Sequence, residues 1–439
     1  MNGNWQICLA ALCAGLVLSP QASLAQGSCE APAAWTSHAT VPPPDASVPL
    51  TSNCVFHLWA WQTLLWMTQP AADGKPRFLG FPNEAETFAP AAASPAIFVA
   101  RATPKVLTLT ARAAKSSDPF GSILQAGSDG VMIHRGGRAI YYSVNFDPTY
   151  YNFIRDKKYF DPAIFEAAPA DQNFPDGALE FKYSWRILAE NEGATGFYTQ
   201  QADIQLLIDR NGEVKTDPSQ VRRVNVALVG IHVVGVVKDH PEFIWATFEH
   251  KDNAPDLPAG MAPDAPTPVS DKDWVFYRAN TSASQSNLPN GGAVKLVDPT
   301  AQTLTPVTDV FRRFPWGSQP ADAANAANIV ALNASVRSRV LSSDPVWQNY
   351  ILIGGTWLPP NSLAPNQSLG TRAVASTRLS NATMETFMQD EDTNCLTCHN
   401  TRSAFKAGVR LPPKNLNLSH SLTEAYFRAK KSLNVLKLQ

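Results

Sequence analysis

The sequence predicts an α+β protein with a large, mainly antiparallel-sheet body and a small helical module at the C-terminus. The first observation is a hairpin pattern at 221–250, where two apolar, β-branched runs flank a short polar turn. The second is one apolar stretch with helical spacing at 54–70. The third is the loop-like segment PPNSLAPNQSLGTRA at 359–373, after which helix-start signals appear. We therefore divide the chain into a leader (1–25), a body (26–372) and a C-terminal module (373–439).

The first 25 residues are typical of a secretory signal peptide. They carry no charge, and an apolar run from Ile7 to Leu18 precedes the small-x-small pattern Ser23-Leu24-Ala25. The pattern departs from the usual one because no Lys or Arg precedes the apolar run. No later segment is long enough to span a bilayer. The sequence predicts an exported, soluble, periplasmic protein.

Cysteine usage is consistent with an oxidising compartment. Removal of the leader takes Cys8 and Cys13 with it, so four cysteines remain. We expect Cys29 and Cys54 to form a disulfide that closes a proline-rich loop and contributes roughly 3 kcal/mol. The alternative is a pair of buried free thiols.

Most of the body reads as strands and turns. Helical spacing predicts a buried helix at 54–70 that ends at Pro70. His57 in this helix is either a histidine whose hydrogen bonds are satisfied within the protein or one that reaches a cofactor. Alternation of β-branched and aromatic residues predicts strands across most of 90–240, with Asp-Pro pairs as turns. A Pro-rich exposed loop is expected at 252–272 and a further strand at 350–359.

Two histidines fall in the predicted hairpin. If the turn centres near His240, facing residues have numbers that sum to about 480 or 482. His232 and His250 then share one sheet face, within roughly 5–8 Å of each other. Such a pair could hold a metal or approach a cofactor. The alternative is one core histidine and one at a strand end.

The C-terminal module contains two predicted helices. The run SNATMETFMQ begins with a possible N-cap, Ser380 or Asn381, and places Met384, Phe387 and Met388 on one face. Ser421-Leu422-Thr423-Glu424 matches a capping box, so a final helix is expected from Leu422 to Leu433.

Between these helices, Cys395-Leu396-Thr397-Cys398-His399 has the spacing of a covalent haem site. With six Cys and eight His in 439 residues, this pattern arises by chance with a probability of roughly 10⁻³. Two thiols at this spacing can add to the two vinyl groups on one porphyrin edge, and the next imidazole reaches the iron. A zinc site would need two further ligands, but His420 is the only candidate that follows in the tail. A redox disulfide would not need His399.

The motif resembles that of c-type cytochromes, over about residues 376–439. The upstream strand pair and the run Asn-Ala-Thr-Met-Glu-Thr-Phe are also similar to a bacterial family of exported cytochrome-c-like proteins. The resemblance implies one haem c, attached through Cys395 and Cys398, with His399 as the proximal iron ligand. On this interpretation, residues 373–439 form a c-type haem-binding module.

The sixth iron ligand is not settled by the sequence. No methionine follows His399, so His420 is the candidate distal ligand, with a backbone-bonded histidine near a helix cap as its alternative. The remaining possibilities are a methionine before the motif, a histidine of the body, or no ligand. These residues are Met384, Met388, His57, His232 and His250.

Charge separates the tail from the rest of the chain. Residues 401–439 hold eight Lys and Arg against one acid, Glu424, so a tail of +7 and a remainder of -8 make up the net charge of -1. This balance shows no nucleic-acid-binding signature. The tail is either neutralised internally or forms a docking face for an acidic redox partner. Arg402, Lys406 and Arg410 are candidates to neutralise haem propionates.

We therefore expect one-electron transfer in the periplasm. The alternative is a peroxidase-like or oxidase-like haem enzyme with an open or exchangeable sixth iron position under the large body. A third class is a ligand-binding or sensing module.

Overall fold

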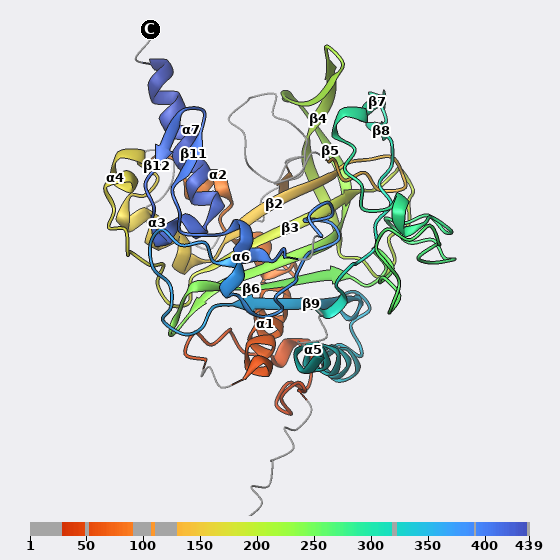
Figure 1. Ribbon diagram of the computed structural model, residues 1–439, viewed down its shortest axis with the longest axis horizontal. Coiled ribbons are helices and arrows are strands. Elements are labelled where there is room, and N and C mark those ends of the chain that lie inside the picture. Colours follow the sequence, from red (N-terminus) through yellow and green to blue (C-terminus); the bar gives the residue numbers. More distant parts are fainter. Residues whose placement is uncertain are drawn as a thin grey trace, which may run out of the picture.

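The computed structural model describes residues 29–48, 52–90, 107–109, 130–317, 323–389 and 392–436. The predicted signal peptide at 1–25 lies outside these residues. A large twisted sheet crosses the centre of the molecule, with helices α1 and α5 on one side and the C-terminal chain on the other (Figure 1). The predicted α+β class with a mainly antiparallel sheet is confirmed.

Eight strands of the described chain form this sheet. Six of them lie in the order β1-β4-β5-β6-β9-β10. The other two branch from β5, because β3 pairs with β5 and β2 pairs with β3. All pairs are antiparallel except β1 with β4. The strands are β1 (Leu107–Leu109), β2 (Ile140–Phe146), β3 (Leu179–Ile187), β4 (Thr199–Arg210), β5 (Glu213–Val237), β6 (His240–His250), β9 (Tyr350–Trp357) and β10 (Val374–Ala375). Two small ribbons lie outside it, β7 (Lys295–Asp298) with β8 (Thr303–Thr305) and β11 (Ala404–Lys406) with β12 (Val409–Leu411).

The helices are short apart from three. They are α1 (Asn53–Thr68), α2 (Glu84–Thr87), α3 (Pro148–Lys157), α4 (Pro162–Ala167), α5 (Ala323–Ser335), α6 (Cys395–Cys398) and α7 (His420–Leu436). The buried helix expected at 54–70 is confirmed as α1. No helix in the described part of the chain is long and apolar enough to cross a membrane.

The Asp-Pro pairs begin helices, which corrects their assignment as turns. Asp147 accepts hydrogen bonds from the backbone N–H groups of Thr149 and Tyr150 at the start of α3. Asp161 does the same for Ala163 at the start of α4. The first N–H groups of a helix have no acceptor within the helix, and an aspartate at the N-cap accepts from them. Proline fits the first helical position because its missing N–H would have had no partner there.

The two faces of the central sheet differ in chemistry because side chains alternate along each strand. One face is apolar and packs against α1 and α5. Its core includes Phe181, Tyr183, Trp185, Ile231, Val233 and Phe248 from the sheet, with Trp59 and Trp61 from α1. The opposite face carries two rows across β3, β5 and β6: Glu180, Val234 and Trp245, then Lys182, His232 and Thr247. The C-terminal chain covers this second, largely polar face.

The hairpin of β5 and β6 is confirmed, but its register is not the predicted one. The turn is Lys238-Asp239, and Val237 pairs with His240. A two-residue turn centres between residues, so facing numbers sum to odd values, and His232 faces Thr247. His250 therefore points to the other face, and the predicted His232–His250 pair does not exist.

The C-terminal chain shares its core with the body. β10 lies beyond the predicted boundary at 373 and extends the main sheet by pairing with β9. Leu396, Leu411 and Leu418 pack in one cluster with Phe146 and Phe165 of the body. The region from 373 onwards is thus built into the body's polar face, and the described residues show no separate core for it.

The second predicted helix of the tail is confirmed and the first is not. α7 covers the expected 422–433, but Ser421 donates to Glu180 instead of capping the helix, and Leu422 N–H donates to Ser419 Oγ. Residues 381–388 form successive turns. Asn381 donates to Thr247 Oγ1 and to a carbonyl of β6, so tertiary hydrogen bonds override the helical pattern here.

Candidate functional site

The two thiols of the motif lie on one helical turn. Asn394 caps α6 by accepting from Leu396 N–H at 3.0 Å, and Thr397 Oγ1 accepts from Asn394 N–H at 3.2 Å. Positions three apart lie on the same side of a helix, so this turn presents Cys395 and Cys398 side by side. Both are free thiols, Cys395 half-buried and Cys398 exposed.

His399 follows directly and is oriented through one ring nitrogen. Its Nδ1 lies 2.7 Å from the carbonyl oxygen of Leu418. A carbonyl can only accept, so Nδ1 carries the proton and a neutral His399 has its lone pair on Nε2. Metal-bound histidines commonly donate their second ring N–H to a backbone carbonyl in this way. The donor set of the motif therefore fits a haem with His399 Nε2 as the iron ligand.

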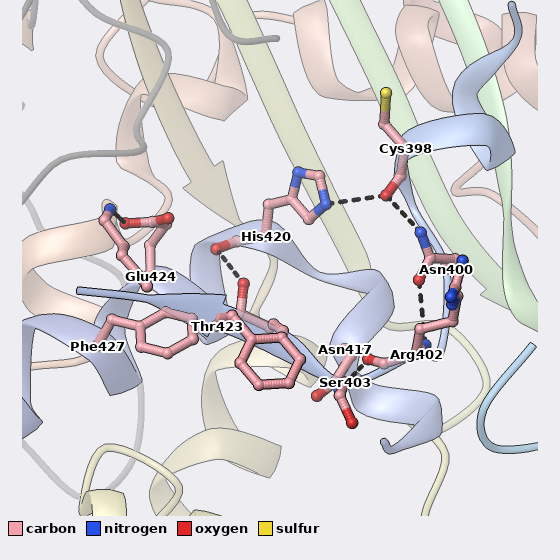
Figure 2. A pocket seen from close by; sticks show the side chains of 12 residues that line it. Cys398, Asn400, Arg402, Ser403, Asn417, His420, Thr423, Glu424 and Phe427 are labelled. Carbon is pink, nitrogen blue, oxygen red and sulfur yellow. Dashed lines mark hydrogen bonds and ion pairs between the residues drawn. The ribbon is translucent and has the colours of Figure 1, made fainter. Parts of the chain in front are cut away.

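The imidazole of His399 is stacked between two other rings. Trp245 of β6 lies on one side, with ring centroids 4.0 Å apart and planes tilted by 41°. The ring centroid of His420 lies 3.9 Å from that of His399, with planes 22° apart. Figure 2 shows the contact of His420 with Cys398, in which Nε2 lies 3.3 Å from the carbonyl oxygen. Trp245 is 5% exposed.

This geometry does not support His420 as the distal ligand. Two axial imidazoles each approach the iron to roughly 2 Å from opposite faces of the porphyrin. The stacked rings of His399 and His420 leave no room for a macrocycle between them. The arrangement instead matches the alternative of a histidine near a helix start, bonded to backbone.

The other candidate iron ligands lie in different parts of the structure. Met384 is 1% exposed and packs with Met132 and Ile140, in a cluster that does not include the motif. His57 of α1 is buried and bonded to Asn325 at 2.7 Å. His250 stacks on Phe197, with ring centroids 3.5 Å apart. Of the three body histidines named as candidate ligands, only His232 points to the sheet face that the C-terminal chain covers.

A partly buried cluster of titratable side chains that the sequence did not indicate lies next to Cys395. His232 Nε2 is 3.3 Å from Glu385 Oε2, and Lys182 is the β3 partner of His232. Burial raises the pKa of the Cys395 thiol, and the charge of Glu385 raises that pKa further. This direction is opposite to the lowered thiol pKa that is typical of reactive redox cysteines.

A pocket of about 360 Å³ borders the motif on the side of α7 (Figure 2). Cys398 and His420 line it together with Arg402, Lys406 and Phe427. Cys395 and His399 are not among its lining residues. The volume lies at the lower end of the range for small-ligand pockets. The pocket thus reaches one thiol of the motif and the basic part of the tail.

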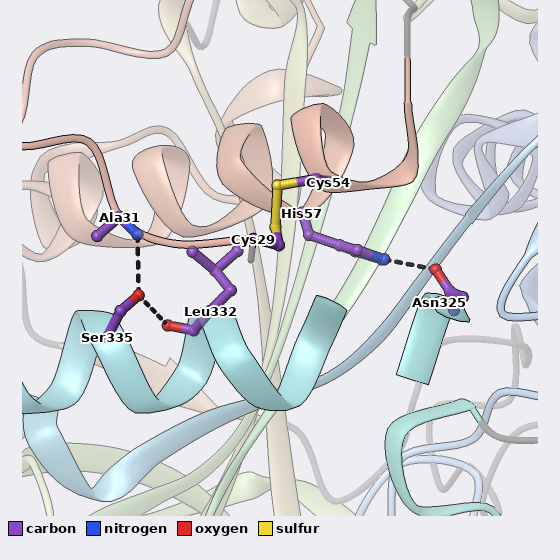
Figure 3. Close-up of a disulfide and its surroundings, with 7 residues drawn as sticks. All are labelled: Cys29, Ala31, Cys54, His57, Asn325, Leu332 and Ser335. Atoms are coloured by element: carbon purple, nitrogen blue, oxygen red, sulfur yellow. Dashed lines mark hydrogen bonds between the residues drawn. A yellow bond between two sulfur atoms is a disulfide. The ribbon is translucent and has the colours of Figure 1, made fainter. Parts of the chain in front are cut away.

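A zinc site built from the four body and tail cysteines is excluded, because Cys29 is bonded to Cys54, as the sequence predicted (Figure 3). The bridge ties the N-terminal segment to α1, and Ala31 N–H donates to Ser335 Oγ of α5 at 2.8 Å. Within the described residues, no group of three or more His, Cys, Asp or Glu side chains could hold a metal ion.

Part of the positive charge of the tail is paired within the protein. Lys406 pairs with Glu424 inside the tail, and two acids of the body pair with Arg428 and Lys430, namely Glu84 and Glu166. The exposed basic residues near the pocket are Arg402 and Arg410, which donate to the hydroxyls of Ser368 and Ser403.

Three site features were not found by sequence reasoning: Trp245, Glu385 and the carbonyl of Leu418. A carbonyl belongs to every residue and leaves no trace in the sequence. Trp245 lay in a strand that was recognised, but its contact with His399 depends on the hairpin register. Comparison with protein-family models, curated proteins and solved structures found no match for this chain.

Proposed function

We propose that this protein is exported and carries one haem c, bound covalently through Cys395 and Cys398 with His399 as the proximal ligand, for one-electron transfer. The observation that carries the proposal is the Nδ1 contact of His399 with Leu418 O at 2.7 Å. It sets the protonation of the imidazole for coordination through Nε2, directly after two free thiols on one helical turn.

The haem supplies an iron that cycles between the ferric and ferrous states. The chain contributes three things. α6 presents both thiols to one edge of the cofactor. Leu418 O holds the proton on His399 Nδ1 and increases the basicity of Nε2. Trp245 and the leucines around α6 exclude water from the proximal side.

Export is supported by the Cys29–Cys54 disulfide, because structural disulfides form and persist in oxidising compartments. Covalent haem attachment also takes place outside the cytoplasm. We propose a periplasmic location on these two grounds together with the leader at 1–25.

Covalent attachment is tested by making the protein with intact c-type maturation machinery, denaturing it and staining for haem. We expect the stain to stay with the chain and to disappear in the Cys395→Ala/Cys398→Ala double variant. His420→Ala is the matched control, since it alters a neighbouring ring without touching the thiols. A wild-type chain without covalent haem would refute the proposal.

A haem enzyme is the second candidate, and the partly buried His232–Glu385 pair near Cys395 favours it. Such a pair could exchange protons with a molecule bound at the iron. Carbon monoxide separates the two functions. A low-spin ferrous spectrum that carbon monoxide leaves unchanged indicates an electron carrier, whereas ready binding to a high-spin form indicates catalysis or gas sensing.

The β11–β12 ribbon is our proposed docking surface for an acidic redox partner. Phe405 is 72% exposed, more than any other large apolar side chain in the described chain. The guanidinium of Arg410 lies 5.8 Å from its ring, and Arg402 is also exposed. An apolar centre with a basic rim fits an acidic protein.

The docking surface is tested with Phe405→Ala and Arg410→Glu. Both should slow electron exchange with an acidic electron-transfer protein, and the effect of Arg410→Glu should fade as salt is added. Exchange with a small neutral oxidant is the control and should not change. Equal rates for all variants with the acidic protein would refute this surface.

A further inference from the structure

The indole of Trp245 contacts the imidazole of His399 from a rigid part of the fold. Trp245 lies in β6 between β5 and β9, where it pairs with Val234 and Thr356. It is 5% exposed, and the ring of Phe243 packs against it edge-on, with planes at 89°. The side chain is thus held by a central strand and by its neighbours.

Ring contacts, and not a hydrogen bond, hold the indole in place. Its Nε1–H is buried and has no acceptor among the described residues. Leaving a buried donor unpaired has a cost. The contact that this side chain does make is that of its aromatic face with the imidazole of His399.

We propose that Trp245 is the positioning residue that fixes the plane of the His399 imidazole when haem is bound. The contact with Leu418 O holds one ring nitrogen, and rotation of the imidazole about that contact would change the plane of the ring. The indole, whose centroid lies 4.0 Å from that of the imidazole, opposes this rotation on one side. This inference rests on the proposed haem function, and it names the residue that sets the orientation of the ligand.

His420 is the second ring in contact with His399. It is half-buried and lines the pocket, and its Nε2 lies 3.3 Å from the carbonyl oxygen of Cys398 (Figure 2). A sheet residue cannot move without distorting β6, whereas His420 sits at the start of a helix beside open volume. Trp245 therefore defines the ligand plane, and His420 follows it.

Two substitutions distinguish the effect of the aromatic ring from the effect of its N–H group. Trp245→Phe keeps an aromatic face without the donor, and Trp245→Leu removes the aromatic face. The matched control is Trp185→Leu, which removes a fully buried indole from the opposite, apolar face of the sheet. Covalent haem staining reports the proposed function in every variant, and circular dichroism reports folding.

Two readouts test the orientation itself. The ferric electron paramagnetic resonance spectrum reports the plane of the axial imidazole through its g values. In haem-free protein, the nuclear magnetic resonance shifts of the His399 ring protons report the stack directly, because an indole face shields protons above it. We expect Trp245→Leu to change the g values and to remove the shielding, while Trp245→Phe and Trp185→Leu stay close to wild type.

The outcomes are distinguishable from those of the proposed function. Unchanged g values and ring-proton shifts in Trp245→Leu would overturn the positioning role even if haem is covalently bound. Equal changes in Trp245→Phe and Trp245→Leu would overturn it too, since the N–H and not the ring would then be responsible. Absence of covalent haem from wild type would overturn the proposed function and this role together, whether or not the shielding is present.

Discussion

Replacing Glu180 by Gln should remove a pH dependence from the stability of this protein. Glu180 lies on the polar face of the sheet, where it accepts hydrogen bonds from Ser419 Oγ at 2.8 Å and Ser421 Oγ at 2.9 Å. These two serines flank His420 at the start of α7. Burial raises the pKa of Glu180 from 4.5 to about 7, against the opposing effect of the two hydroxyls.

The sign and size of the effect follow from this shift. An acid with a raised pKa in the folded state binds more protons folded than unfolded between pH 4.5 and about 7. Stability contributed by Glu180 is therefore present below pH 4.5 and is lost as the pH rises through 7. At about 1.4 kcal/mol for each pH unit, the loss is about 3 kcal/mol. Because Glu180 is only half-buried, this is an upper limit.

The assay is urea denaturation of wild type and Glu180→Gln at pH 4, 5.5, 7 and 8. Any constant cost of the substitution appears at every pH and cancels in the comparison. We expect the free energy of unfolding of the variant, relative to wild type, to rise by up to about 3 kcal/mol from pH 4 to pH 8. A difference that stays flat, or one that falls with pH, would show that Glu180 titrates normally.

Three further changes have defined effects on the free energy of unfolding, each measured by urea denaturation. Removing the bridge with Cys29→Ser/Cys54→Ser should cost about 3 kcal/mol for a loop of 25 residues, and no loss would contradict the chain-entropy account. Arg312→Met leaves the buried carboxylate of Glu249, 3.0 Å away, unpaired and should cost about 3–5 kcal/mol, of which adding Glu249→Gln should restore part. Gly235→Ala should cost about 1–3 kcal/mol, because the new Cβ would lie within 3 Å of two core side chains, and a neutral result would mean the core relaxes.

Local patterns predicted the elements that depend on one segment alone. Alternation identified β9 and the β5–β6 hairpin, and helical spacing identified α1 and α7. The errors came where a distant partner decided the outcome. The run at 380–389 has helical spacing, but Asn381 bonds to β6 and the segment folds into turns. The predicted turn was centred near His240, whereas the observed turn is Lys238-Asp239. This difference alone put His250 on the wrong face in the prediction.

The candidate site divides in the same way. Cys395, Cys398 and His399 lie within five consecutive residues, so their spacing indicates the chemistry before any folding is considered. The orientation of His399 needs Leu418, which is 19 residues away, and Trp245, which is 154 residues away along the chain. The ring of His420 was expected across the iron and lies against His399 instead.

By itself, the sequence determined the α+β class, the disulfide and the haem-type motif, because each depends on residue types at short spacing or on a count of cysteines. Only the tertiary structure decided which sheet face the C-terminal chain covers, and that this chain shares its core with the body. It also decided which rings meet the imidazole of His399. These features depend on strand register and on contacts between distant segments, where a shift of one residue turns a side chain to the opposite face.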